Sequence, residues 1–311
     1  MPEPKHPPPG AGKWGVLLLA HGAPERLDDL PQFLLNVRNG RALPPPVVEE
    51  MRRRYAAIGG GSPLLRLTRR QAEALAARLG RPVYVGMRNW HPLIAETVAT
   101  IKKDNLERLV AVCLAPQHSR TSVGKYRARL EEALAQEGAA LRLDFVESWH
   151  DQPQLIQGFA EKLRATLNQA RDAAGAEPPA ILTAHSVPEK TIATGDPYDA
   201  QVRRTASRVA EEAGCREWHL AYQSQGMTPE PWLGPTVESV LDRLAEAGHR
   251  HVVVAPIGFV ADHLEVLYDV DIAFRDTART KGVTLWRTES LNDSPLLIEA
   301  LAAIVRDRIG S

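Results

Sequence analysis

Short apolar runs alternate with longer amphipathic stretches along most of the chain, and this alternation is the feature that most constrains its fold. The apolar runs have the length and β-branched content of buried strands, while helical periodicity fills the intervals between them. Such an order is typical of an α/β fold in which helices cover both faces of a parallel sheet. The expected strands are residues 14–20, 82–87, 109–114, 141–146, 180–184, 217–222, 251–257 and 283–286.

One ending recurs in these runs. GVLLLAHGAP and AILTAHSVP both pass from an apolar run into Ala-His, a small residue and a nearby Pro, which places His21 and His185 at matching points. Later segments match as well, since HPLIAETVATIKKDNLERLVAVCLAP and GPTVESVLDRLAEAGHRHVVVAP each read as a Pro-started helix followed by a strand that ends in Pro. We therefore expect two similar Rossmann-like halves with parallel sheets. Chance similarity between short motifs is the competing explanation.

The two expected halves define where a ligand would bind. Open α/β sheets bind ligands in the crevice outside the carboxyl ends of their strands. His21 and His185 would then face each other across a cleft between the halves. The expected divisions are a disordered Pro-rich tail at 1–13, α/β domains at 14–146 and 147–293, and a helix at 294–311 that packs back on the first domain.

The composition limits the partners of the chain. Lys and Arg number 38, as do Asp and Glu, so no net field draws the chain to nucleic acid or to an acidic membrane surface. Cys113 and Cys215 lie far apart, which indicates neither a disulfide framework nor a metal cluster. The start lacks the apolar segment of a signal peptide, and no run of about 18 apolar residues predicts a transmembrane helix. We expect a cytoplasmic protein without an integral membrane segment.

Glycine-rich stretches occur near the start and at 58–68. GAGKWG at 10–15 matches G-x-G-x-x-G but precedes the first strand, whereas a dinucleotide loop follows a strand and opens a helix, so we expect no NAD site. IGGGSPLLRLT has two interpretations. It is a flexible turn in which Ser62 caps the helix started by Pro63, or a loop whose backbone approaches a ligand closely.

The segment PIGFVADHLEVLYDVD at 256–271 is the richest in titratable residues. If it is helical, Asp262, Glu265 and Asp269 fall on one stripe. Such a row is either a solvated helix face or the wall of a cleft that handles cations or protons. Because the segment follows an apolar strand, we favour the cleft. Zinc-protease spacing is absent here, and no G-x-S-x-G elbow accompanies Ser186.

Several motifs together carry a resemblance to a known family. IGGGSPL, AHSVPEK, GDPYDAQV, AYQSQG, PWLGPTVES and PIGFVADHLEVLYDVD occur in the order and approximate spacing of ferrochelatases, which insert ferrous iron into a porphyrin in heme biosynthesis. The resemblance spans the chain from about Gly15 to Asp293. LAPQHSRTSVGKY, VESWHDQP and GFVADHLEVLYD look most similar to the soluble coproporphyrin III ferrochelatases, lyases whose product is iron-coproporphyrin. The resemblance thus implies a chelatase-like fold with its cleft between the halves.

The resemblance assigns the central chemistry to His185 and Glu265. It implies that this pair binds Fe²⁺ and accepts pyrrole protons, because a neutral imidazole and a carboxylate can do both. His21 stands where the coproporphyrin branch commonly has tyrosine. It either becomes the axial ligand of the product iron or only forms local hydrogen bonds. Iron is a substrate in this chemistry, and we expect no permanently bound cofactor and no iron–sulfur cluster.

The carboxylated rim of the porphyrin requires polar partners, and arginine offers carboxylates a forked set of donors. Ordinary surface solvation is the alternative for each arginine. The alternative functions are a protoporphyrin IX ferrochelatase, a non-enzymatic tetrapyrrole-binding protein, and a cobalt or sirohydrochlorin chelatase, against which the DHLE and GDPY motifs speak. Besides porphyrin and ferrous iron, we expect transient contact with neighbouring heme-pathway enzymes. The residues expected around the porphyrin are Arg38, Arg41, Arg54, Ser62, Tyr126 and Ser224.

Overall fold

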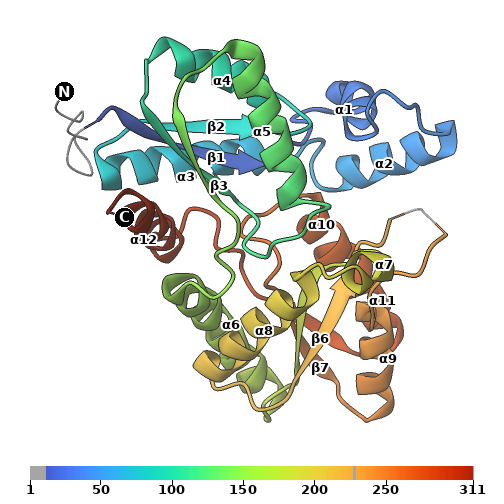
Figure 1. Ribbon diagram of the computed structural model, residues 1–311. Helices are drawn as coiled ribbons and strands as arrows, with labels where there is room; N and C mark the ends of the chain where they lie inside the picture. Colours follow the sequence, from blue (N-terminus) through green and yellow to red (C-terminus); the bar gives the residue numbers. More distant parts are fainter. Residues whose placement is uncertain (1–11, 227–228, 311) are drawn as a thin grey trace, which may run out of the picture.

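The computed structural model describes residues 12–226 and 229–310, and it contains two four-stranded parallel sheets (Figure 1). Most of the expected Pro-rich tail lies outside the described residues. All the strands expected from the sequence are present, with ends shifted by a residue at most. The first sheet contains β1 (Trp14–Ala20), β2 (Val83–Met87), β3 (Arg108–Cys113) and β4 (Arg142–Val146). The second contains β5 (Ala180–His185), β6 (Trp218–Gln223), β7 (His251–Pro256) and β8 (Thr284–Arg287).

The two sheets share one topology. Their strand orders are β2-β1-β3-β4 and β6-β5-β7-β8, so each strand of the first sheet has an equivalent four strands later in the chain. Neighbouring strands pair in parallel throughout both sheets. His21 directly follows β1, and His185 is the last residue of the equivalent strand β5. The prediction of two similar Rossmann-like halves is therefore confirmed.

Helices connect the strands and cover the sheets, as the parallel pairing requires. The helices of the first half are η1 (Leu27–Asp29), α1 (Leu30–Val37), α2 (Pro45–Ala57), α3 (Leu64–Leu79), α4 (Ile94–Lys103) and α5 (Val123–Glu137). Those that follow are α6 (Pro153–Ala174), α7 (Glu189–Ala193), α8 (Tyr198–Ala213), α9 (Val237–Glu246), α10 (Leu264–Leu267), the π-helix η2 (Asp269–Phe274), α11 (Arg275–Thr280) and α12 (Pro295–Gly310).

The core is continuous between the halves. Residues Val16 to Leu19 of β1 are fully buried because helices cover both faces of the sheet. One apolar cluster includes side chains of β1, α3, α6, β5 and α12. In Figure 1, α12 (dark red) lies beside the first sheet, where it contacts α3, and it also contacts α6. Shared packing of this kind gives the strand ends of the two sheets a defined relative position.

Candidate active site

His185 lies at the carboxyl end of β5 with one ring nitrogen tied down and the other free. Its Nδ1 is hydrogen-bonded to the carbonyl oxygen of Ser186. Because a carbonyl can only accept, Nδ1 donates to it, and Nε2 is the ring nitrogen left to face another group. The Tyr198 hydroxyl donates to the carbonyl of His185 at 2.9 Å and holds the strand end in place. Sequence and fold together therefore place Nε2 of this imidazole at the edge of the sheet.

Glu265 in α10 is the partner that this free nitrogen faces. Its Oε1 lies 3.6 Å from Nε2 of His185, and about a third of each side chain is exposed. Its Oε2 lies 3.7 Å from Nε2 of His263. Burial acts to raise the pKa of Glu265, but the nearby His185, His263 and His21 outweigh it and lower the pKa to about 2. The carboxylate is therefore ionised and lies between two imidazoles.

His263 belongs to this group although the sequence reasoning did not select it. Its Nδ1 is 3.0 Å from the Ala261 carbonyl oxygen, which orients Nε2 toward Glu265. Burial lowers its pKa, yet contact with Glu265 dominates and raises it above the usual value. The sequence signal was available, because His263 lies two residues before Glu265 in the DHLE motif.

The prediction that Asp262, Glu265 and Asp269 share one helical stripe is wrong. The chain reaches α10 only at Leu264 and changes to a π-helix at Asp269, so regular α-helical spacing does not apply. Asp262 precedes the helix and accepts hydrogen bonds from Ser290 at 2.7 Å and Asn292 at 2.9 Å. Glu265 therefore lies among histidines, while Asp262 stabilises a loop.

His21 occupies the equivalent edge of the first sheet. Its Nδ1 is 2.9 Å from the Gly22 carbonyl oxygen, so this ring too carries its proton on Nδ1. Its Nε2 accepts a hydrogen bond of 3.0 Å from the side-chain amide of Asn89. One edge of His21 is open to solvent, but the surrounding protein and the positive charge of Arg88 lower its pKa to about 4. His21 is therefore neutral at physiological pH.

Two of the arginines expected around the porphyrin are exposed on the first half. Arg38 follows α1, and Arg41 lies in the loop between α1 and α2. Neither guanidinium has a hydrogen-bond or ion-pair partner among residues 12–226 and 229–310. Both are therefore open to an incoming carboxylate.

Arg54 and Ser224 meet at Asp269. Arg54 donates to Glu50 at 2.8 Å and lies 5.1 Å above the ring of Tyr268, with Asp269 a further 3.8 Å contact. Ser224 comes from the other side and donates to the Asp269 carboxylate at 2.6 Å. The structure brings these two predicted residues together, but through a shared acid that the porphyrin prediction did not include.

Ser62 has a structural role. Its hydroxyl accepts from the backbone N–H of Leu64, the first residue of α3, at 3.3 Å, and its own N–H donates to the Pro24 carbonyl at 2.9 Å. A side chain at Gly61 would meet the Glu25 carbonyl oxygen at 2.0 Å, so the glycine loop packs closely on the turn after β1. Of the two interpretations of this loop, these contacts favour the capped turn.

Tyr126 is buried in α5, and an arginine that the sequence reasoning missed covers its ring. The guanidinium of Arg88 lies 5.1 Å from the ring centroid. Arg88 is half-buried directly after β2 and has no acidic partner within the described part of the chain. Its place after a predicted strand, beside the edge that carries His21, was the signal that could have identified it.

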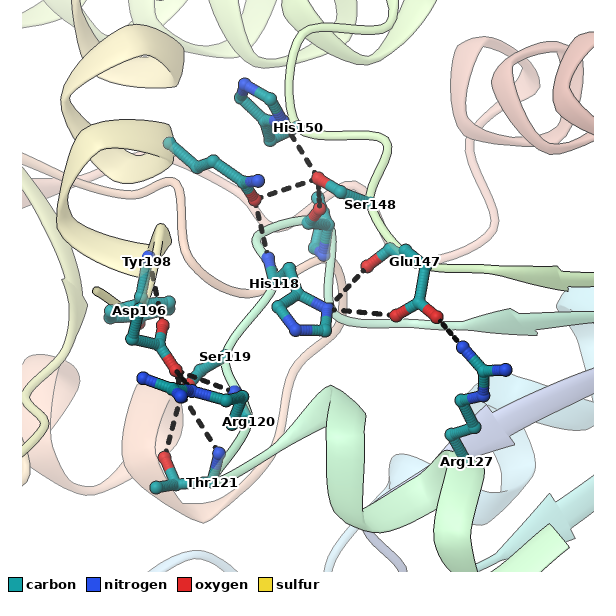
Figure 2. Close-up of polar contacts among 12 residues, drawn as sticks. His118, Ser119, Arg120, Thr121, Arg127, Glu147, Ser148, His150, Asp196 and Tyr198 are labelled. Carbon is teal, nitrogen blue, oxygen red and sulfur yellow. Dashed lines mark hydrogen bonds and ion pairs between the residues drawn. The ribbon is translucent and has the colours of Figure 1, made fainter. Parts of the chain in front are cut away.

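A polar junction joins the two halves. The buried carboxylate of Asp196, in the second half, accepts hydrogen bonds from the Ser119 hydroxyl at 3.2 Å and the Arg120 backbone N–H at 2.8 Å (Figure 2). It also accepts from the backbone N–H of Tyr198 at 3.1 Å. Ser119 and Arg120 follow β3 of the first half. The GDPY motif therefore connects the halves.

A second set of contacts extends this junction. The Gln201 side-chain oxygen of α8 accepts from the backbone N–H of His118 at 2.6 Å and from the Ser148 hydroxyl at 2.8 Å. Nδ1 of His118 lies 3.1 Å from the Glu147 carbonyl and 3.3 Å from the Glu147 carboxylate (Figure 2). The LAPQHSRTSVGKY and GDPYDAQV motifs therefore meet, which relates the strand ends of the two sheets.

Residues 12–226 and 229–310 contain no group of three or more His, Cys, Asp or Glu side chains placed to hold a metal ion. Over the same ranges, no helix combines the length and the apolar character needed to cross a membrane.

Comparisons with known proteins agree with the geometry. The family model described as Ferrochelatase matches residues 13–309. A ferrochelatase of Acidobacterium capsulatum is 46% identical over 94% of this chain and 93% of its own length. A coproporphyrin III ferrochelatase of Geobacillus thermodenitrificans is 38% identical, with 95% and 96% covered. The structure of SirB from Bacillus subtilis with Fe³⁺ shares the fold, with a TM-score of 0.55 and 12% identity over 95% of each chain. The chain belongs to the ferrochelatase family.

Proposed function

We propose that this ferrochelatase, a metal chelatase acting on porphyrin and iron, inserts Fe²⁺ into coproporphyrin III and releases iron-coproporphyrin. Relatives named coproporphyrin III ferrochelatases are 36% to 39% identical over nearly the whole chain. Coproporphyrin has four carboxylates and protoporphyrin IX has two, so a tetracarboxylate needs more cationic donors. Arg38 and Arg41, whose guanidinium groups are open, together with the half-buried Arg88, could meet that need.

The observation that carries the mechanism is the pairing of His185 with Glu265 at 3.6 Å. The ionised Glu265 attracts Fe²⁺ and replaces part of its water shell, while the four pyrrole nitrogens supply most of the final ligands. The free Nε2 of His185 can take up a pyrrole proton as iron enters. Glu265 then stabilises the imidazolium that results. The second proton can pass to the same carboxylate–imidazole group, which includes His263.

We propose that His21 binds the iron of the product from the opposite half. Its proton is on Nδ1, so Nε2 is the atom with ligand character, and its lowered pKa keeps it neutral. The competing role, a purely local hydrogen bond, is supported by the contact between Nε2 and Asn89. Porphyrin binding by Arg54, Ser224 and Tyr126 remains part of the proposal, whereas Ser62 would act through the shape of its loop.

The deciding experiment is anaerobic metalation of coproporphyrin III and protoporphyrin IX side by side, followed by absorbance. We expect coproporphyrin III to turn over at least about tenfold faster than protoporphyrin IX. A factor of this size corresponds to the loss of one ionic contact. Faster turnover of protoporphyrin IX would favour the alternative ferrochelatase. Binding of both porphyrins without metalation would favour a tetrapyrrole carrier.

The surroundings of the reaction are also part of the proposal. The enzyme would work in the cytoplasm as a lyase, without a permanently bound cofactor, and exchange porphyrins by transient contact with neighbouring heme-pathway enzymes. Cys113 and Cys215 are buried in different halves, which gives no support to an iron–sulfur cluster. Size-exclusion chromatography and iron analysis of the purified protein would test these points.

A further inference from the structure

Both hydrogen bonds of the Asn89 side-chain amide nitrogen go to His21. Nδ2 donates to Nε2 of the His21 ring at 3.0 Å and to the His21 carbonyl oxygen at 3.2 Å. The Asn89 backbone N–H donates to the same carbonyl at 3.0 Å. Since both contacted atoms can only accept when Nδ1 of the ring carries the proton, the amide nitrogen has to be the group that faces them.

The position of Asn89 is itself well supported. Asn89 is 6% exposed, and its carbonyl accepts a hydrogen bond of 3.0 Å from Asn36 of α1. A side chain at Gly22 would meet the backbone nitrogen of Trp90 at 2.7 Å, and Gly22 has a φ of +81°. The turn after β1 and the turn after β2 therefore lie close together, and this packing holds Asn89 against His21.

The second half lacks this contact, although an amide residue ends its equivalent strand. Gln223 ends β6, the equivalent of β2, and its side chain is buried. Its oxygen accepts from Thr183 at 2.7 Å and its nitrogen donates to the Glu265 backbone carbonyl at 2.8 Å. The amide thus positions α10, and Nε2 of His185 faces the Glu265 carboxylate.

We propose that Asn89 is a positioning residue that covers the Nε2 lone pair of His21, so that His21 binds product iron only in exchange for this hydrogen bond. The inference rests on the proposed role of His21 as axial ligand. In the metal-free protein the contact orients the ring toward the cleft. After iron insertion, the Fe–Nε2 bond forms as the hydrogen bond breaks, and no proton is transferred. The exchange weakens axial ligation and favours release of the product.

The test compares two probes, ferric coproporphyrin III and metal-free coproporphyrin III, by equilibrium titration. In Asn89→Leu the lone pair is uncovered, so ferric coproporphyrin III should bind about two- to tenfold more tightly, the range expected for one hydrogen bond. Its absorbance should show a larger histidine-ligated fraction. Metal-free coproporphyrin III has no iron to ligate, so its affinity should change less than twofold. Asn89→Ala repeats the test with a smaller side chain.

The double variant that combines His21→Ala with Asn89→Leu decides whether Asn89 acts through His21. In His21→Ala, adding Asn89→Leu should leave the affinity for ferric coproporphyrin III unaltered, because the residue acts through the ring. Asn36→Ala removes a nearby amide without touching His21 and should not raise the affinity for the ferric probe. Unchanged or weaker ferric binding in folded Asn89→Leu and Asn89→Ala, or the same gain in the His21→Ala background, would overturn the inference. If His21→Ala itself leaves the spectrum of the bound ferric probe unaltered, the axial-ligand proposal fails instead.

Discussion

His21 and His185 stand at the ends of equivalent strands, and the two halves treat them alike on one side of the ring. In both residues Nδ1 is bonded to the carbonyl of the next residue, so both present Nε2 to the space between the sheets. The difference lies in what Nε2 meets. Nε2 of His185 faces the Glu265 carboxylate at 3.6 Å, whereas Nε2 of His21 accepts from the amide of Asn89 at 3.0 Å.

This difference separates two kinds of chemistry on one scaffold. The negative charge of the Glu265 carboxylate beside His185 attracts cations and protons. Burial and the Arg88 guanidinium lower the pKa of His21 to about 4 and so favour a neutral ring. Under the proposed mechanism, the second half would serve iron delivery and proton uptake. The first half would supply a neutral ligand to the product iron.

The variant His185→Ala gives the strongest test of the difference between the two halves. We expect iron insertion to fall by about 10²- to 10⁴-fold, since this change removes both an iron ligand and a proton acceptor. Coproporphyrin III should still bind within a few-fold of the parent. The rate of anaerobic metalation and the porphyrin affinity measure the two effects. If His21→Ala slowed insertion as much as His185→Ala, the proposed division between the halves would be wrong.

Glu265→Gln should slow turnover by about 10²-fold or more while porphyrin affinity changes little. The amide keeps the shape of the side chain but cannot attract Fe²⁺ or accept a proton. Steady-state metalation rates measure the effect, with Glu73→Gln on the exposed face of α3 as the matched control. A loss smaller than about tenfold would place Glu265 on an ordinary solvated acidic surface.

Asp196→Ala tests whether the polar junction maintains the relation between the halves. The change leaves the backbone N–H groups of Arg120 and Tyr198 without their acceptor. We expect the free energy of unfolding to drop by about 2–4 kcal/mol, measured by chemical denaturation. Asp172→Ala, at an exposed position of α6, is the control and should change it by less than about 0.5 kcal/mol. Equal stability of the two variants would contradict a role for the junction.

The smallest expected effect concerns the pH at which His21 stops ligating the product iron. A protonated imidazole cannot ligate iron, so axial ligation by His21 is lost as the pH falls through its pKa. Because that pKa is lowered to about 4, the ligated spectrum of bound ferric coproporphyrin III should persist well below pH 6.5. Absorbance from pH 7 to pH 4 measures this, and His21→Ala should show no such transition. A midpoint near pH 6.5 would show that burial and Arg88 do not act on the ring as described.

The sequence by itself determined the fold class and the edge at which the site lies. Apolar runs and helical periodicity are local patterns, so they predict strands and helices before any tertiary contact is known. Parallel strands bring their carboxyl ends to one edge, so His21 and His185, at the ends of equivalent strands, were placed correctly without knowledge of the loops. The sequence patterns therefore predicted both the two halves and the matching histidines.

Tertiary structure alone decided what each histidine touches. Asn89 reaches His21 from a turn 68 residues away, and the π-helix at Asp269 breaks the expected row of acids. The Ser62 hydroxyl, for which the sequence left two roles open, accepts from the backbone N–H of Leu64 in a turn packed against the backbone of Glu25. Periodic patterns report which face of an element is buried. Hydrogen-bond partners depend on how separate loops pack within a few tenths of an ångström, and this is a property of the folded chain.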